Sequence, residues 1–187
     1  NEVSIAAING PSSVVISGSV DGLKAVAGKL ESQGVRTREL EVSHAFHSPL
    51  LEPMLEEFEE HAEKVTYGKP RVRMVSNLTG RLAAAGEMGR ARYWREHMRQ
   101  TVQFDAGLQS AVAAGCTTFI EIGPQPHLRA IAAKTDAGME NRIKVSMTRN
   151  GSAYAQMCES LAQVYVEGQP VNWAGFEGGW RRSRVAL

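Results

Sequence analysis

The stretch Thr117-Thr118-Phe119-Ile120-Glu121-Ile122-Gly123-Pro124 is nearly all apolar until it stops at the Gly-Pro turn. A run of this kind is typical of a buried strand in a parallel sheet, which is covered on both faces. A helix is expected from about residue 128, and a short strand follows at 144–147. Strands that alternate with helices predict an α/β layer architecture.

Toward the N-terminus, the pattern predicts the order β-β-α-β. Two strands at 3–8 and 14–16 flank the turn signal Asn9-Gly10-Pro11, which indicates a hairpin. A helix capped by Asp21 follows. The alternation of apolar and charged residues at 36–42 then predicts a half-exposed strand.

Helical periodicity also appears in the middle and near the end of the chain. Helices are expected at about 51–62, 93–98, 104–114 and 154–167, and a further strand at 71–76. The tail from residue 169 contains aromatic residues and arginines without a period, which is typical of a linker.

Length and composition indicate an ordinary globular chain. Its 187 residues are 43% hydrophobic and 22% charged, and 21 basic against 20 acidic residues give a formal net charge of +1. This balance argues against nucleic-acid binding by bulk charge. No apolar run approaches the roughly 20 residues that span a bilayer. Two cysteines and the absence of a visible targeting signal favour a reduced, cytoplasmic setting, with no nucleic acid or membrane as partner.

The loop Ser43-His44-Ala45-Phe46-His47-Ser48-Pro49 lies between a predicted strand and a predicted helix, where α/β sheets place reacting groups. Imidazole titrates near neutral pH, so His47 is a candidate general base. Two alternatives stay open from the residues alone. In the first, both histidines only cap or pack. In the second, the i,i+3 spacing of His44 and His47 serves to bind a metal, although no carboxylate or cysteine stands at a suitable spacing. Zinc-protease, Walker and dinucleotide-binding motifs are absent.

The motif His44-Ala45-Phe46-His47-Ser48-Pro49-Leu50, followed by Glu52-Pro53-Met54, resembles the signature of malonyl-type acyltransferase domains in modular polyketide synthases. Further blocks resemble the same family in the same order, so the resemblance covers nearly the whole chain. These blocks are 9–18, 75–80, Tyr93-Trp94 with His97, 102–104 and 121–124, and the segments 171–173 and 181–187 resemble the linker after the domain.

This resemblance implies an α/β fold with two subdomains. Residues 1–42 are expected to form a ferredoxin-like small subdomain that lacks its first β-α unit. Residues 43–168 are expected to form the C-terminal part of an α/β-hydrolase-like large subdomain, and residues 169–187 the linker. An incomplete sheet of this kind predicts exposed apolar strand edges.

The resemblance also implies roles for individual residues. His47 is expected to deprotonate a serine, and His97 to supply the backbone carbonyl that orients the imidazole, as Asp does in a serine-protease triad. Asn9, His44 and Phe46 are expected to bind substrate. The Phe46 ring occupies a position associated with extender choice and leaves little room for an α-methyl group, where methylmalonyl types usually carry Tyr-Ala-Ser-His. One methyl group is worth roughly 1–3 kcal/mol of discrimination.

The implied activity is transfer of a malonyl group from malonyl-CoA to the phosphopantetheine thiol of an acyl carrier protein, by a Ser-His ping-pong mechanism. No bound cofactor or metal is expected, because coenzyme A arrives with the substrate. The family's nucleophile lies in a Gly-His-Ser-x-Gly elbow, and no Gly-x-Ser-x-Gly occurs in this sequence. The chain by itself is therefore expected to be inactive and to need the N-terminal half of the domain that carries the serine.

Three other functions stay open. In the first, the chain is a non-catalytic piece that docks the carrier protein or the neighbouring ketosynthase. In the second, the domain transfers a methylmalonyl or other extender unit. A stand-alone malonyl transferase of fatty-acid synthesis fits the core blocks but not the tail from Trp173 to Leu187.

Overall fold

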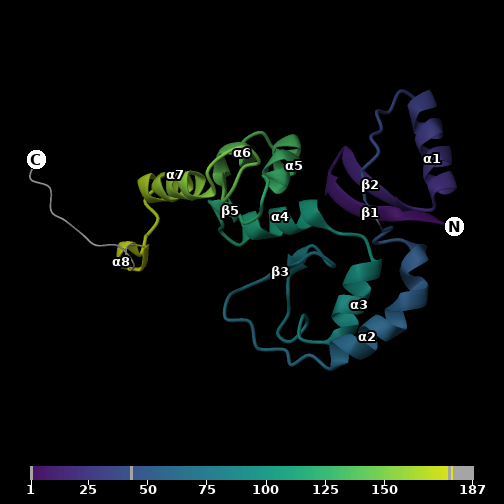
Figure 1. Ribbon diagram of the computed structural model, residues 1–187, viewed down its shortest axis with the longest axis horizontal. Helices are drawn as coiled ribbons and strands as arrows, with labels where there is room; N and C mark the ends of the chain where they lie inside the picture. Colours follow the sequence, from purple (N-terminus) through teal and green to yellow (C-terminus); the bar gives the residue numbers. More distant parts are fainter. Residues whose placement is uncertain (1, 43, 177, 179–187) are drawn as a thin grey trace, which may run out of the picture. The chain divides into compact units, whose positions relative to one another are not determined.

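The computed structural model describes residues 2–42, 44–176 and 178 (Figure 1). Within this part, the chain is a mixed α/β structure whose strands form two-stranded sheets. It divides into two compact units, Asn1–Thr117 with Ala130–Glu140 and Thr118–Arg129 with Asn141–Leu187. Residues 43, 177 and 179–187, which include one end of the predicted loop and most of the predicted linker, lie outside the described residues. The subdomain boundaries at 42 and 168 stay predictions.

The first unit begins with the predicted hairpin. Strand β1 (Val3–Gly10) pairs antiparallel with β2 (Ser13–Gly18), which confirms the hairpin. Helix α1 (Val20–Ser32) follows, and Ser19 rather than Asp21 is its N-cap, because the Ser19 hydroxyl accepts a hydrogen bond from the Gly22 N–H at 3.2 Å. Asp21 lies in the first turn, where its charge complements the helix dipole.

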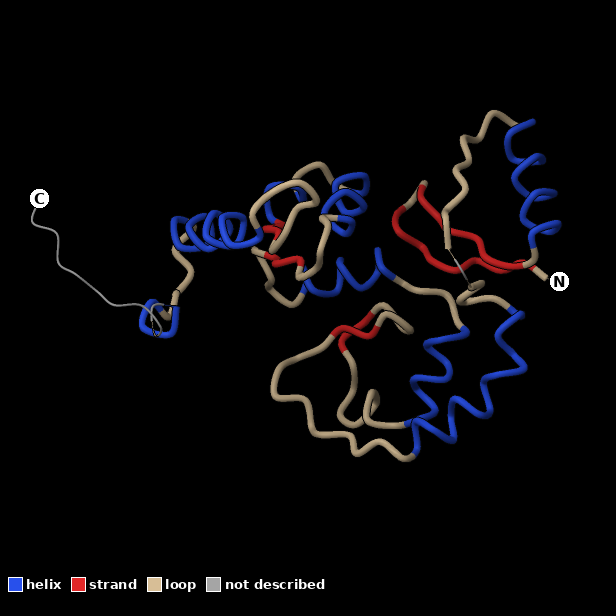
Figure 2. Tube along the Cα trace, viewed as in Figure 1, coloured by secondary structure: helices blue, strands red, loops and turns tan. Residues whose placement is uncertain are grey.

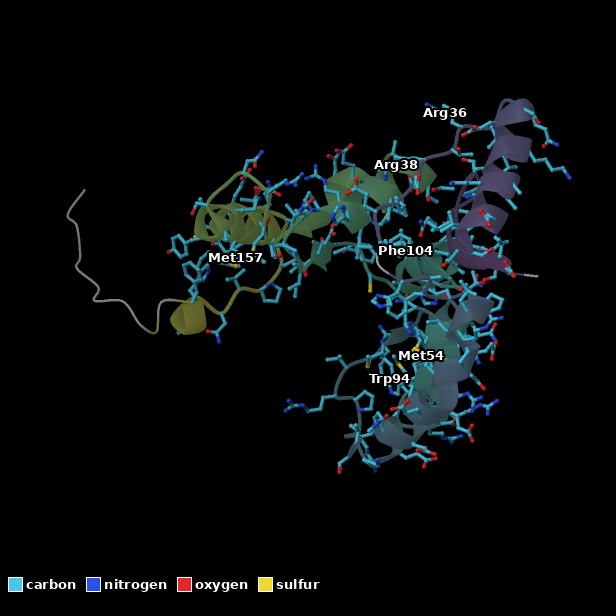
Figure 3. All side chains as sticks on the ribbon, turned by 45° about the vertical axis from the view of Figure 1, so that its right-hand side comes forward. Arg36, Arg38, Met54, Trp94, Phe104 and Met157 are labelled. Carbon is cyan, nitrogen blue, oxygen red and sulfur yellow. The ribbon has the colours of Figure 1, made fainter. Side chains whose placement is uncertain are left out.

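The strand predicted at 36–42 is wrong. This segment is an exposed loop between α1 and the next helix, without a paired strand (Figure 2). The side chains of Arg36 and Arg38 project from it (Figure 3). A half-exposed strand needs a neighbour for its backbone groups, and the described residues supply none beside this segment. The alternation in the sequence is therefore not sufficient to make this segment a strand.

Two helices and a short 3-10 turn form the middle of the first unit. The turn η1 (Pro49–Met54) leads directly into α2 (Leu55–Glu63), and α2 packs against α3 (Ala91–Arg99). The predicted helix at 51–62 is thus a 3-10 turn followed by an α-helix, because Pro53 lies inside its first part. Leu51 of the turn and Leu55, the first residue of α2, are buried.

The predicted strand at 71–76 contracts to two residues. Strand β3 (Val75–Ser76) pairs antiparallel with β4 (Arg81–Leu82). The turn between them requires Gly80, whose φ of +66° lies in the left-handed region and whose added Cβ would meet the Ala106 Cβ at 2.6 Å. Helix α4 (Phe104–Ala113) confirms the helix predicted at 104–114.

The second unit contains residues 118–124 of the apolar stretch. Strand β5 (Phe119–Glu121) pairs with β6 (Ile143–Val145) in parallel, as predicted, but the stretch is not buried on both faces. Ile120 is 59% exposed and Ile122 is 86% exposed. Side chains two residues apart on a strand share one face, so this exposed face is apolar. The exposed strand edges that an incomplete sheet implies stay a prediction.

Four helices accompany β5 and β6 in the sequence. The predicted helices from about 128 and at 154–167 are α5 (His127–Thr135) and α7 (Ala153–Val166). Two short helices, α6 (Met139–Arg142) and α8 (Trp173–Phe176), were not predicted because four residues are too few to show a period. In the part of the chain that the structure describes, no helix is both long and apolar enough to cross a bilayer.

Candidate active site

The histidine-rich loop is fastened at Ser48, the residue that starts η1. Its fully buried hydroxyl donates a hydrogen bond to the Ala45 carbonyl at 2.7 Å and accepts one from the Leu50 N–H at 3.3 Å. Pro49 occupies the first position of the turn, where no N–H is needed. The Ser-Pro pair therefore ends the loop at a fixed point, directly after His47.

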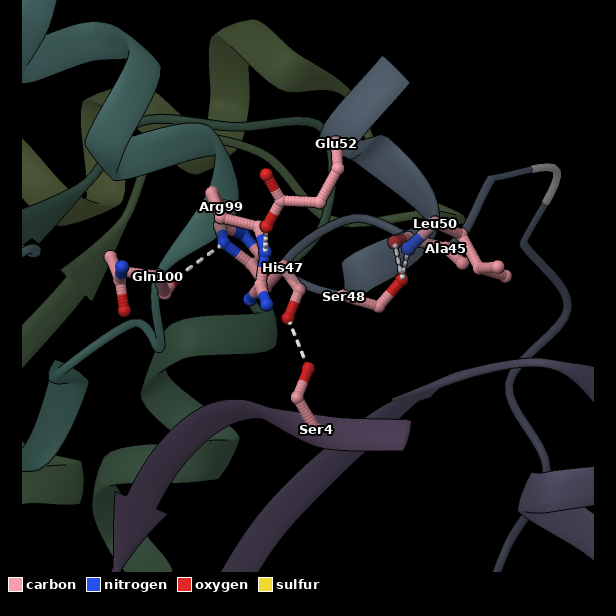
Figure 4. Close-up of polar contacts among 8 residues, drawn as sticks. All are labelled: Ser4, Ala45, His47, Ser48, Leu50, Glu52, Arg99 and Gln100. Atoms are coloured by element: carbon pink, nitrogen blue, oxygen red, sulfur yellow. Dashed lines mark hydrogen bonds and ion pairs between the residues drawn. The ribbon is translucent and has the colours of Figure 1, made fainter. Parts of the chain in front are cut away.

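The backbone of His47 adopts an unusual conformation. Its φ of +62° lies in the left-handed region, and no other non-glycine residue among those described has a positive φ. Such a conformation costs roughly 1–3 kcal/mol in a non-glycine residue and persists only where the surroundings hold it. Two hydrogen bonds hold it here. The His47 N–H donates to the Met98 carbonyl at 3.2 Å, and the Ser4 hydroxyl donates to the His47 carbonyl at 2.6 Å (Figure 4).

The imidazole is held by a third contact. Nδ1 of His47 lies 2.8 Å from the carbonyl oxygen of Gln100. A carbonyl oxygen only accepts, so Nδ1 donates its proton in this contact, and in the neutral imidazole the lone pair then lies on Nε2. A histidine in this tautomer is a base at Nε2, the arrangement in which a neighbouring hydroxyl can be deprotonated.

The orienting carbonyl is not the one predicted. The sequence analysis assigned it to His97, whereas the structure places the Gln100 carbonyl against Nδ1. His97 lies inside the last turn of α3, where carbonyls run along the helix axis. Gln100 is the C-cap in extended conformation, so its carbonyl turns away from the axis and is available to the ring. The position of Gln100 directly after the predicted helix is the sequence feature that points to its carbonyl.

His97 lies beside His47 through its ring. The two ring centroids are 6.2 Å apart in an edge arrangement, and the His97 ring stacks on Tyr93 at 6.0 Å with 24° between the planes. Burial lowers the pKa of His97, and the neighbouring His47 lowers it further. The neutral form of His97 is therefore favoured next to the candidate base.

The lowered pKa of His97 predicts that stability falls on acidification. Below the ordinary pKa of about 6.5, the unfolded chain binds a proton that folded His97 resists, so the free energy of unfolding decreases as pH falls through this window. Replacing His97 by Phe removes this contribution. In urea unfolding of the complete protein at pH 7.5 and 5.5, the loss of stability should be smaller for His97→Phe than for the wild type.

A matched variant separates this effect from other titrations. His61 on α2 is exposed, so His61→Phe should lose as much stability between the two pH values as the wild type. Equal losses in the wild type and in His97→Phe would contradict the assignment of this pH dependence to His97.

Ion pairs tie α3 to the turn and helix before it. Arg99 Nε lies 2.6 Å from Glu52 Oε1 of η1, and Arg95 Nη1 lies 2.5 Å from Glu59 Oε2 of α2. Arg99 directly precedes Gln100, and η1 follows His47 closely in the sequence, so the Arg99–Glu52 pair joins these two segments (Figure 4). It thereby links the two segments that meet in the His47–Gln100 hydrogen bond.

The predicted substrate-binding residues are placed in two groups. His44 and Phe46 lie together, with ring centroids 6.0 Å apart, and Phe46 is 50% exposed. Asn9 lies near the opposite end of β1 from Ser4, roughly 17 Å along the strand. Its backbone carbonyl accepts a hydrogen bond from the Thr135 hydroxyl at 3.0 Å. The contacts that hold His47 do not include Asn9.

One further observation concerns the metal site that the sequence left open. Among the described residues, no group of three or more His, Cys, Asp and Glu side chains is arranged to hold a metal ion.

Ser4 is a residue of the site that the sequence does not indicate. Its hydroxyl contacts the loop from 43 residues away, and such a tertiary contact leaves no pattern in the sequence.

Comparison with known proteins connects this geometry to a family. A family profile described as "Acyl transferase domain" matches residues 1–170. The chain is 39% identical over 177 residues to mycoketide-CoA synthase of Mycobacterium tuberculosis, which covers 95% of this chain and 4% of that protein. It is 39% identical over 190 residues to spectinabilin polyketide synthase system protein NorB of Streptomyces orinoci, covering 100% and 9%.

Solved structures agree with these relatives. The acyltransferase domain from the second module of the salinomycin polyketide synthase is similar with a TM-score of 0.88 at 41% identity, covering 95% of this chain and 42% of that one. Malonyl CoA-acyl carrier protein transacylase from Clostridium perfringens has a TM-score of 0.74 at 24% identity, covering 89% and 51%, a likeness of fold alone. The chain thus spans about half or less of these solved proteins.

Proposed function

This chain belongs to the acyltransferase domains of type I polyketide synthases, of which it is a C-terminal portion, and from that premise we propose that it supplies the general base for malonyl transfer. The base is His47. The complete domain transfers a malonyl group from malonyl-CoA to an acyl carrier protein. The observation that carries this proposal is the hydrogen bond between Nδ1 of His47 and the Gln100 carbonyl, which in the neutral imidazole places the lone pair on Nε2.

The proposed reaction proceeds in two steps. In the first, Nε2 of His47 takes the proton of a serine hydroxyl while the serine oxygen attacks the thioester carbon of malonyl-CoA. The carbon–sulfur bond breaks, and the coenzyme A thiol leaves with the proton from Nε2. In the second, Nε2 takes the proton of the phosphopantetheine thiol, the sulfur attacks the malonyl ester, and the serine oxygen leaves with that proton.

The serine is proposed to come from another part of the same domain, since no Gly-x-Ser-x-Gly occurs in this sequence. By this proposal, the chain alone is inactive and acts together with the segment that carries the serine. The acyl carrier protein is the acceptor, and a neighbouring ketosynthase and the linker beyond residue 168 are further proposed partners. No bound cofactor is part of the proposal.

Malonyl is proposed as the extender unit because of Phe46. Its half-exposed ring lies one residue before the base, at the position that the family associates with extender choice. A ring there opposes a methyl group on the α-carbon of the acyl chain. Such a steric contact discriminates by roughly 10- to 200-fold.

The test is a comparison of kcat/KM for malonyl-CoA and methylmalonyl-CoA with the complete domain that contains this chain. The wild type should transfer malonyl to its carrier protein and prefer malonyl-CoA. Phe46→Ser should lower that preference by about 10- to 200-fold. Leu50→Ala, which removes another half-exposed apolar side chain from the same loop region, should leave the preference unchanged.

Two outcomes would count against the proposal. No transfer from either thioester by the wild-type domain would contradict the acyltransferase function. Transfer with an unchanged preference in Phe46→Ser would contradict the role of Phe46 and leave the function intact.

A further inference from the structure

The hydroxyl of Ser4 contacts the backbone of the candidate base from a distant part of the sequence. It donates a hydrogen bond of 2.6 Å to the His47 carbonyl, and the contact is partly buried (Figure 4). Resting on the proposed function, we propose that Ser4 is a positioning residue: its hydroxyl holds the left-handed backbone of His47, so that Nδ1 stays on the Gln100 carbonyl and Nε2 stays free as the base.

The need for such a residue follows from the conformation of His47. At a φ of +62°, the backbone is strained unless neighbouring groups hold it, because a left-handed residue places Cβ close to its own carbonyl oxygen. The N–H is held by Met98 and the ring by Gln100. The carbonyl is held by Ser4, and without that hydroxyl the peptide group after His47 loses the contact that opposes its rotation.

The same strand also holds the segment that carries the orienting carbonyl. The Val102 N–H donates to the Ala6 carbonyl at 2.8 Å, and the Ile8 N–H donates to the Val102 carbonyl at 2.9 Å. The Thr101 hydroxyl donates to the Ile5 carbonyl at 2.7 Å. Residues 101 and 102 directly follow Gln100, so β1 fixes the position of that carbonyl as well.

Strand β1 is therefore a common frame for both partners of the Nδ1 hydrogen bond. β1 binds the segment after Gln100 through backbone hydrogen bonds with Val102. Among the described hydrogen bonds, it binds His47 through the Ser4 hydroxyl only. Backbone pairing survives a change of side chain, whereas the Ser4 contact does not. Beside the Met98 hydrogen bond and the Arg99–Glu52 ion pair, the Ser4 hydroxyl is thus the contact that ties the His47 carbonyl to β1.

The experiment compares Ser4→Thr with Ser4→Val in the complete acyltransferase domain. The two replacements have nearly the same shape and both suit a strand, but only threonine keeps the hydroxyl. Ser17 lies opposite Ser4 in the register of β1 and β2, so Ser17→Val is the matched control. The readouts are kcat and KM for malonyl-CoA and the tautomer of His47, measured from its imidazole nitrogen shifts by NMR.

We expect Ser4→Val to lower kcat about tenfold with little change in KM, since loss of one partner of a partly buried hydrogen bond acts on the order of 1.4 kcal/mol, which is a factor of ten. The share of the Nδ1–H tautomer should fall with it. Ser4→Thr should restore both values, and Ser17→Val should match the wild type. Equal kcat and equal tautomer populations in Ser4→Val and Ser4→Thr would overturn the proposal. So would a loss of kcat with an unchanged tautomer, which indicates a merely structural role.

The tautomer readout keeps this inference separate from the proposed function. If the wild-type domain transfers no malonyl group, the proposed function fails. The nitrogen shifts of His47 still report whether the Ser4 hydroxyl sets the tautomer. A shift that changes in Ser4→Val but not in Ser4→Thr supports the positioning role in that case as well.

Discussion

Replacing His47 by alanine in the complete acyltransferase domain is expected to slow malonyl transfer to the carrier protein by at least about 10²- to 10⁴-fold, the range that general acid–base catalysis contributes. The reason is the geometry of the ring. Nδ1 contacts the Gln100 carbonyl, so in the proposed reaction Nε2 takes the serine proton in the first step and the thiol proton in the second. The measurement is the rate of carrier-protein malonylation at saturating malonyl-CoA.

The control for this variant is His61→Ala. His61 is exposed on α2, and only a distant contact of 3.9 Å joins it to Glu57. Its loss should leave the transfer rate within about twofold of the wild type, since surface substitutions of this kind change little. Transfer that persists at the wild-type rate in His47→Ala would exclude His47 as the base.

The second large effect concerns stability at Glu121, within the stretch that indicated the fold. Glu121 is buried at the end of β5, and its carboxylate accepts hydrogen bonds from the Leu128 N–H at 2.8 Å and the Arg129 N–H at 2.9 Å. Alanine would leave these two N–H groups at the start of α5 without a charged acceptor. Hydrogen bonds to charged groups contribute about 1.5–3 kcal/mol each. Glu121→Ala removes two such bonds and is therefore expected to lower the free energy of unfolding by about 3–6 kcal/mol.

Urea unfolding of the complete domain measures this loss. Glu121→Gln keeps an amide oxygen that can accept one hydrogen bond, so its loss should lie between those of the wild type and Glu121→Ala. Glu56→Ala on the exposed face of α2 should change stability by less than about 0.5 kcal/mol. A Glu121→Ala variant no less stable than Glu56→Ala would show that the carboxylate does not anchor α5.

The elements with a strong local signal were predictable from the sequence. The hairpin β1–β2 follows from two β-branched runs around Asn9-Gly10-Pro11, and α3, α4 and α7 follow from helical periodicity. The strand at 36–42 was not, because a strand depends on a partner as well as on its own pattern. The length of a strand likewise depends on its neighbours, and 71–76 shortens to Val75–Ser76.

Part of the candidate site was predictable and part was not. The loop and its candidate base, His47, stand out because of the resemblance to a family motif. The orienting carbonyl was assigned to His97 instead of Gln100, because backbone carbonyls carry no sequence signal and only the end of α3 shows which one turns toward the ring. The left-handed conformation of His47 and its contact with Ser4 are tertiary features. Such features follow from packing between segments far apart in the chain.

In the proposed function, His47 activates a serine that carries the malonyl group between two thiols. The most direct measurement is the intact mass of the complete domain after incubation with malonyl-CoA and without carrier protein. We predict that one malonyl group adds to the serine of the wild-type domain, leaves when carrier protein is supplied, and adds far more slowly to His47→Ala. A wild-type domain that malonylates its carrier protein without forming this adduct, or an adduct that forms equally fast in His47→Ala, would contradict the account.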